Sequence, residues 1–91
     1  MKKLINKILD DYVADKLIEL CKSEALVNNL CCRAEDSGFY IRIYVKIRAY
    51  KDEYYRHILS FRKEEAFQYL FNFNEFKEIL HRAFKQYIKE N

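Results

Sequence analysis

Residues 39–50 read Phe-Tyr-Ile-Arg-Ile-Tyr-Val-Lys-Ile-Arg-Ala-Tyr, and the architecture is built around this stretch. Its odd positions are apolar, and its even positions are tyrosine or cationic. Because successive side chains of a strand point to opposite faces, the alternation predicts a β-strand with one buried and one solvated face. The β-branched and aromatic content favours the same assignment. Other elements must cover the apolar face, and amphipathic segments are present on both sides.

The length and composition limit the chain to one globular domain, residues 1–91. Ninety-one residues leave no room for a second hydrophobic core. At 51% apolar and 34% charged, the composition is typical of globular and not of disordered proteins. No apolar run approaches a membrane span, and the first residues do not resemble a signal peptide, so we expect a cytoplasmic protein with no membrane partner.

Amphipathic helices are predicted before and after the strand. Over residues 4–21 the apolar positions recur every three or four residues, which indicates a helix of about five turns. Ser60 is the expected N-cap of a second, short helix. Residues 75–90 carry a regular apolar stripe and are predicted to form the last helix.

Two further strands are predicted beside residues 39–50. The first covers residues 30–35 and is followed by a turn in which Gly38 can adopt a positive φ without strain. With Ser37 and Gly38 as the two loop residues, Cys32 pairs with Ile43.

The third predicted strand covers residues 54–61 and follows a three-residue turn. This turn length places His57 and Leu59 on the buried face, with Leu59 opposite Val45. It leaves Arg56 beside Arg48 on the solvated face.

The predicted fold class is therefore α+β, with an N-terminal helix, a three-stranded antiparallel β-meander and two C-terminal helices packed on one face of the sheet. The expected core residues are Ile8, Leu9, Tyr12, Leu17, Cys21, Cys32, Ile41, Ile43, Val45, Ile47, Leu59, Phe67, Leu70, Ile79, Leu80, Phe84 and Ile88.

The sequence contains no recognisable catalytic, metal or cofactor motif. A nucleophilic enzyme needs an activated side chain beside a base, and the chain has no threonine and three serines at expected turns or caps. His57 beside the Cys32 thiol on the buried face is the one conceivable pair, but burial raises a thiol pKa. The odd, partly adjacent cysteines fit neither a disulfide framework nor a zinc site. We expect a non-enzymatic protein without metal or cofactor.

The solvated face of the central strand carries the candidate partner-binding residues. They are Tyr40, Arg42, Tyr44, Lys46, Arg48, Tyr50 and Arg56. Alternating tyrosines and cations are compatible with an ordinary solvated face, with a protein-binding surface, and with stacking on bases beside paired phosphates. The net charge of +3 is small for a dedicated nucleic-acid binder.

Residues 60–66, Ser-Phe-Arg-Lys-Glu-Glu-Ala, look like the start of the last helix of the double-stranded-RNA-binding domain. The preceding order of one helix and three strands is also similar to that family. There a short basic run at the helix N-terminus grips phosphate, and Arg62 and Lys63 match it. Two glutamates follow at once, and the helix over 75–90 lies outside the family pattern. This resemblance implies nucleic-acid binding.

In size and in helix–meander–two-helix order, the chain also resembles the small phage-encoded anti-CRISPR inhibitors. A proline-free composition rich in lysine and tyrosine suits a phage or mobile element. This resemblance implies a non-enzymatic inhibitor that docks on a host protein or nucleoprotein complex, such as a CRISPR effector, in the host cytoplasm. It covers topology alone and assigns no residue a role.

A homodimer is also expected, because a tyrosine-rich face and an unguarded sheet edge are costly to leave in water. Pairing edge to edge through residues 54–60 is favoured over pairing of the two solvated faces. Repulsion among the cations opposes the second arrangement.

Overall fold

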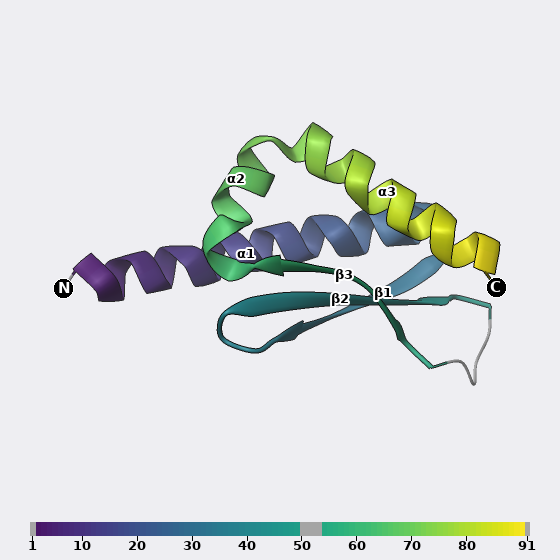
Figure 1. Ribbon diagram of the computed structural model, residues 1–91, viewed down its shortest axis with the longest axis horizontal. Helices are drawn as coiled ribbons and strands as arrows, with labels where there is room; N and C mark the ends of the chain where they lie inside the picture. The colour runs from purple at the N-terminus through teal and green to yellow at the C-terminus, as the bar shows by residue number, and fades with distance from the viewer. Residues whose placement is uncertain (1, 50–53, 91) are drawn as a thin grey trace.

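The computed structural model describes the backbone of residues 2–49 and 54–90, and the side chains of residues 8–49 and 54–90. The elements are α1 (Lys2–Val27), β1 (Leu30–Asp36), β2 (Tyr40–Ile47), β3 (Arg56–Arg62), the 3₁₀ turn η1 (Lys63–Glu65), α2 (Ala66–Phe71) and α3 (Phe73–Glu90). The strands form one antiparallel sheet in the order β1-β2-β3, and the helices lie on one side of it (Figure 1). The predicted α+β fold is confirmed.

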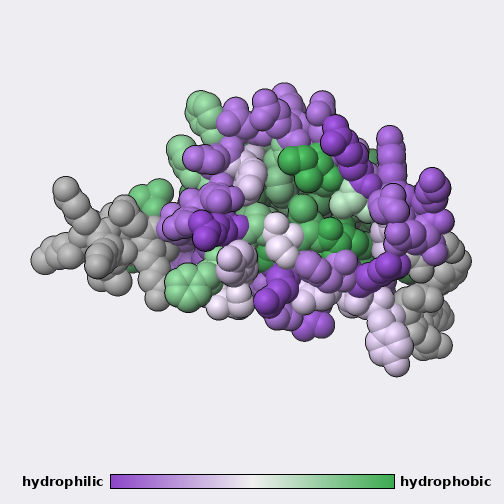
Figure 2. Space-filling model, in the orientation of Figure 1, coloured by the Kyte–Doolittle hydropathy of each residue, from purple (hydrophilic) through white to green (hydrophobic). Residues whose placement is uncertain are grey.

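The hydrophobic core lies between the helices and the inner face of the sheet. Its buried residues are Val13, Ala14, Leu17, Cys21, Ala25, Leu30, Ile41, Ile43, Val45, Phe61, Ala66, Phe76, Leu80, Phe84 and Tyr87. The three β2 residues in this set are each 0% exposed. In Figure 2 hydrophilic side chains surround an apolar centre between α3 and the sheet. The apolar face of the central strand is therefore covered as predicted.

The helix α1 is longer than predicted and is buried along a different stretch. It ends where Asn29 adopts a left-handed φ of +60°, a conformation that asparagine tolerates. The prediction of Ile8, Leu9 and Tyr12 as core residues is wrong, because they are 62%, 51% and 62% exposed. Ile8 and Tyr12 lie on the side of α1 opposite the buried Val13 and Leu17, and the first part of α1 also extends beyond the sheet and α3 (Figure 1). Its buried positions begin at Val13.

The core predictions for Phe67, Ile79 and Ile88 are also wrong, because all three side chains are exposed. The six-residue α2 makes its buried contact through Ala66. The Phe67 ring is left outside, where it stacks on Phe71 with ring centroids 6.2 Å apart. On α3, the apolar stripe is wider than the buried one, so its flanking isoleucines remain in solvent.

The hairpin between β1 and β2 has the predicted face but a register shifted by two residues. Cys32 pairs with Val45 and not with Ile43. The Ser37 backbone N–H donates to the Tyr40 carbonyl at 3.0 Å, so Gly38 and Phe39 form the centre of the turn. Gly38 has a φ of +96°, as turns with glycine at the first central position require. A shift of two residues leaves every side chain on its predicted face.

The pairing between β2 and β3 contains a β-bulge, which is absent from the predicted register. Ile43 pairs with Leu59, but the next residue, Tyr44, pairs with His57, so Ile58 is the extra residue. One extra residue reverses the faces of everything that precedes it in β3. The predicted burial of His57 is therefore wrong, and its ring lies on the outer face against Tyr44, with centroids 5.5 Å apart.

Ser60 is not the N-cap of a helix, as predicted, but a residue of β3. The short helical segment starts later, at η1, where Arg62 occupies the cap position without a side-chain hydrogen bond. The end of β3 is instead fixed by an ion-pair cluster. Lys63, with a side chain only 13% exposed, contacts Asp11 of α1 and, at 2.6 Å, Asp36 of β1. This ammonium joins α1, the hairpin and η1.

We predict that Ile43→Ala lowers the free energy of unfolding by about 2–5 kcal/mol, because it removes a fully buried side chain at the centre of the sheet. Urea unfolding followed by circular dichroism measures this change. The control Ile88→Ala, on the exposed flank of α3, should cost less than about 0.5 kcal/mol. Equal losses in the two variants would contradict the placement of the core.

A second prediction concerns acid sensitivity. The hydrogen bond from Lys63, helped by the Gly38 backbone N–H, lowers the pKa of Asp36. A lowered pKa contributes stability above about pH 4, which disappears as the pH falls through the folded-state value. Asp36→Asn should therefore destabilise the protein at pH 7 by up to about 1 kcal/mol, since water screens this half-exposed pair. The difference in stability between Asp36→Asn and the natural chain should shrink as the pH falls towards 3.

Unfolding midpoints in urea at pH 7 and pH 3 test this sign. The control is Asp15→Asn, because Asp15 forms no ion pair within the described part of the chain. A deficit for Asp36→Asn that persists at pH 3, or one matched by the control, would contradict the assignment.

Candidate functional site

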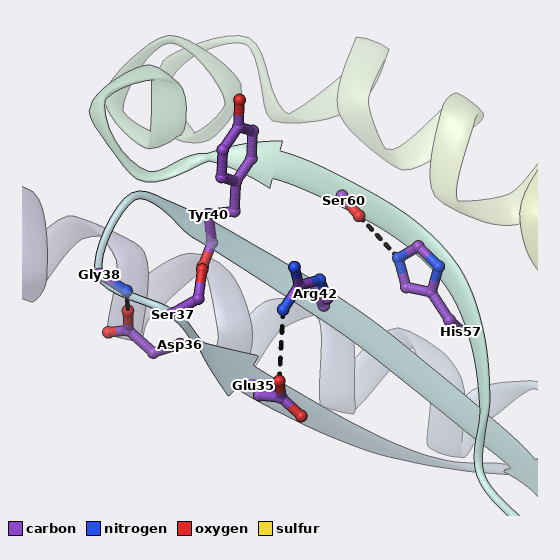
Figure 3. Close-up of polar contacts among 8 residues, drawn as sticks. All are labelled: Glu35, Asp36, Ser37, Gly38, Tyr40, Arg42, His57 and Ser60. Atoms are coloured by element: carbon purple, nitrogen blue, oxygen red, sulfur yellow. Dashed lines mark hydrogen bonds and ion pairs between the residues drawn. The ribbon is translucent and has the colours of Figure 1, made fainter.

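The candidate site is the outer side of the sheet, which the helices leave uncovered. We call it the open face. It consists of Cys31, Arg33, Glu35, Tyr40, Arg42, Tyr44, Lys46, Arg48, Tyr55, His57, Ser60 and Arg62. The strand register puts most of these residues side by side. Arg33 and His57 lie on either side of Tyr44, and Ser60 lies next to Arg42. Figure 3 shows Tyr40 and Arg42 on β2, between the flanking strands.

The structure brings together most of the predicted partner-binding residues. Tyr40, Arg42, Tyr44 and Lys46 are the alternate residues of β2, and the exposed Arg48 follows directly after the strand. Tyr50 lies outside the described residues.

Arg56 is the predicted site residue that the structure places elsewhere. It pairs in the sheet with the inward-facing Val45 and forms an ion pair with Glu90 of α3 at 2.9 Å. The bulge at Ile58 is the reason, because it reverses the face on which Arg56 lies. Arg56 therefore belongs to the helix side and not to the open face.

The open face carries an excess of positive charge. Its cations are Arg33, Arg42, Lys46, Arg48 and Arg62, and its one acid is Glu35. Arg42 contacts Glu35 at 3.3 Å (Figure 3), and Arg62 contacts Glu64 at 3.4 Å. Arg33 and Arg48 form no ion pair with any residue that the structure describes. Their charges remain available to an acidic ligand.

Tyrosine rings lie among these charges on the open face. The ammonium of Lys46 lies over the Tyr55 ring, 5.2 Å from its centroid. Tyr54, immediately before it, is 90% exposed. A hollow of about 330 Å³ is lined by Tyr44, Tyr54, Tyr55, Arg33 and Glu35. This hollow is large enough for a large side chain. Its walls are aromatic, and the Arg33 guanidinium lies at its edge.

Alternation along residues 30–35 predicts that Arg33 lies beside the partner-binding residues, and its pairing with Tyr44 confirms this placement. Tyr55 also belongs to the open face, although the predicted register put it on the buried side. The side of Tyr55 depended on the bulge. The sequence gives no sign of this bulge, because β3 contains neither the glycine nor the proline that often occurs at one.

The bulge also brings His57 and Ser60 together. The His57 Nε2 atom lies 2.6 Å from the Ser60 hydroxyl (Figure 3). A serine nucleophile additionally needs an acid that orients the imidazole and donors for the oxyanion. Within residues 8–49 and 54–90 no carboxylate bonds to the other ring nitrogen of His57. The hydrogen bond between His57 and Ser60 therefore has a structural role, because it joins the residues on either side of the bulge.

The three cysteines fall into two groups. All are free thiols, and burial raises the pKa of Cys21 to about 12 and that of Cys32 to about 11. Cys31 pairs with Lys46 and lies on the open face. Among the described residues, no three side chains of the metal-binding types come close enough together to hold an ion.

No protein-family model, curated protein or solved structure matches this chain significantly. Of the helices in residues 2–49 and 54–90, none has both the length and the apolar content needed to cross a membrane.

We predict that one thiol of the native protein reacts with a disulfide reagent at pH 8, and that this thiol is Cys31. The raised pKa values keep Cys21 and Cys32 protonated and slow. Cys31→Ser should remove the reactive phase, whereas the adjacent control Cys32→Ser should keep it. Two equally reactive native thiols would contradict the assignment of the faces.

Proposed function

We propose that this protein is a non-enzymatic binding module whose open face docks on an acidic surface of a partner protein or nucleoprotein complex. The observation that carries this proposal is the combination, on one uncovered sheet face, of a tyrosine-lined hollow with Arg33 and Arg48, which form no ion pair among the described residues. A small phage-type inhibitor of a host complex, such as a CRISPR effector, is the biological role that we infer.

The chemistry of the open face suits protein recognition. Tyrosine and arginine are enriched among residues that dominate binding energy at interfaces. Tyrosine offers a large contact area for few rotatable bonds, and here the sheet holds Tyr44 between two strands. The unpaired Arg33 beside it can form a charge-assisted bond with a partner carboxylate. The aromatic hollow would receive one anchoring side chain of the partner.

Direct binding of nucleic acid is the second candidate. It is favoured by the interleaving of five cations with tyrosines, because bases stack on aromatic rings while cations pair with phosphates. The two candidates differ in their response to salt. Neutralised phosphates make affinity fall steeply with ionic strength, whereas an interface centred on aromatic contacts weakens less.

The test is a pull-down from a bacterial host lysate, with and without nuclease. Three baits are compared: the natural chain, the double variant Arg33→Glu/Tyr44→Ala on the open face, and Lys85→Glu on the exposed side of α3 as the matched charge control. We expect a protein partner that survives nuclease, binds the control normally, and binds the double variant at least tenfold more weakly.

Two outcomes would contradict the proposal. Loss of every partner after nuclease treatment, with steep salt dependence, would favour the nucleic-acid candidate. A protein partner held equally by the natural chain and the double variant would place the binding site away from the open face.

A further inference from the structure

The outer edge of β1 has no neighbouring strand within residues 2–49 and 54–90 (Figure 3). At one end of the strand, the Arg48 N–H donates to the Asn29 carbonyl at 3.1 Å. At the other end, the Ser37 N–H donates to the Tyr40 carbonyl at 3.0 Å. Because bonded and non-bonded pairs alternate along an antiparallel ladder, the odd residues of β1 bond to β2, and the backbone groups of the even residues point away from it. The even residues are Leu30, Cys32, Ala34 and Asp36.

This edge carries few of the features that keep exposed strands from pairing. Proteins usually guard an edge with a bulge, a proline, a lysine or a very short strand. The strand β1 pairs regularly with β2 along all 7 of its residues, and it contains neither proline nor lysine.

The other edge of the sheet, β3, is less suited to pairing. Its bulge at Ile58 disrupts the ladder that another strand would extend. The edge-to-edge dimer through residues 54–60, which the sequence predicts, is therefore the weaker route.

We propose that β1 pairs antiparallel with β1 of a second copy, which joins the two sheets into one and makes the protein a twofold-symmetric dimer. With the twofold axis at Ala34, residue i of one copy lies opposite residue 68 − i of the other. The outward N–H and C=O groups of Cys32 then bond to those of Asp36 in the second copy, and those of Ala34 bond to their own counterparts.

The side chains on the open face select a second copy as the occupant. In this register Arg33 lies opposite Glu35 of the other copy, and the twofold axis makes the contact twice. Arg33 has no ion pair among the described residues. Arg42 contacts the Oε1 atom of Glu35 at 3.3 Å, which leaves Oε2 without a partner in the described part of the chain. The edge is therefore complementary to itself in charge.

The same charges exclude the neighbouring registers. Moving the axis to Arg33 would set two arginines directly opposite each other, and moving it to Glu35 would do the same with two glutamates. Only the axis at Ala34 converts both side chains into pairs of opposite charge.

The inner side of this contact carries small side chains. Ala34 lies opposite its own counterpart, and both Ala34 and Cys32 are half-buried against the core. Asp36 of the second copy lies opposite Cys32, and its carboxylate is already held by Lys63 of its own copy at 2.6 Å. The pairing therefore brings neither bulky groups nor like charges together on this side.

A dimer of this kind places the two open faces on the same side of one continuous sheet. Exposed ion pairs contribute little binding energy, so the contacts between Arg33 and Glu35 determine the register more than the affinity. Arg33 can exchange this contact for a carboxylate of a foreign partner. The proposal stands independently of the proposed function, because the dimer forms without that partner.

Analytical ultracentrifugation of the full chain tests the proposal. The contact is small, so we expect a dimer that dissociates at micromolar concentration. Ala34→Pro removes an outward N–H without taking a hydrogen bond from β2, and it should weaken the dimer at least tenfold.

The matched control is Ser60→Pro, at the other edge of the sheet. Ser60 lies opposite Arg42, an even residue of β2 whose backbone bonds to β1, so the Ser60 N–H also points away from β2. This variant should leave the dimer unchanged. Circular dichroism confirms that each variant is folded.

A charge exchange tests the register. Arg33→Glu and Glu35→Arg each set like charges opposite each other, so either variant should weaken the dimer severalfold at low salt. The double variant Arg33→Glu/Glu35→Arg restores opposite charges and should recover the affinity of the natural chain.

Four outcomes would overturn the proposal. The first is a protein that stays monomeric up to several hundred micromolar. The second is a dimer that Ala34→Pro leaves intact or that Ser60→Pro dissociates, because it would use another surface. The third is a double charge variant that binds no better than the single ones. The fourth is a monomer that loses a captured protein partner on Ala34→Pro, which would assign the edge to a strand of that partner.

Discussion

The difference between the two faces of β2 is the constraint from which the rest of the structure follows. Ile41, Ile43 and Val45 must be removed from water, and α1 with α3 covers them. The β2 residues that alternate with them, from Tyr40 to Lys46, are tyrosine, arginine and lysine, which a helix could cover only by burying charge. One side of the sheet therefore becomes the core and the other stays uncovered. The candidate site is a consequence of this division.

The sequence predicted those features that depend on periodicity alone. The α+β order, the inward residues of β2 and the shared face of Tyr40, Arg42, Tyr44 and Lys46 all follow from alternation. The two-residue error in the predicted register of β1 and β2 left every side chain on its predicted face, because the side-chain period of a strand is also two.

Features that depend on tertiary geometry were not predictable. The bulge at Ile58 moved His57 to the outer face and Arg56 to the helix side, and no residue type marks it. Ile8 and Tyr12 have the spacing of a helix with an apolar face, but periodicity does not reveal where the sheet ends.

The division of the sheet into a covered and an uncovered side can be measured directly by hydroxyl-radical footprinting with mass spectrometry. Tyr54, which lines the hollow, and Tyr40 of the open face are 90% and 44% exposed, whereas Tyr87 of the core is 3% exposed. We predict rapid oxidation of Tyr54 and Tyr40 in the free protein, with Tyr87 protected until the chain is unfolded. Protection of Tyr40 equal to that of Tyr87 would show that the outer side is covered, and it would contradict this account of the fold and its binding surface.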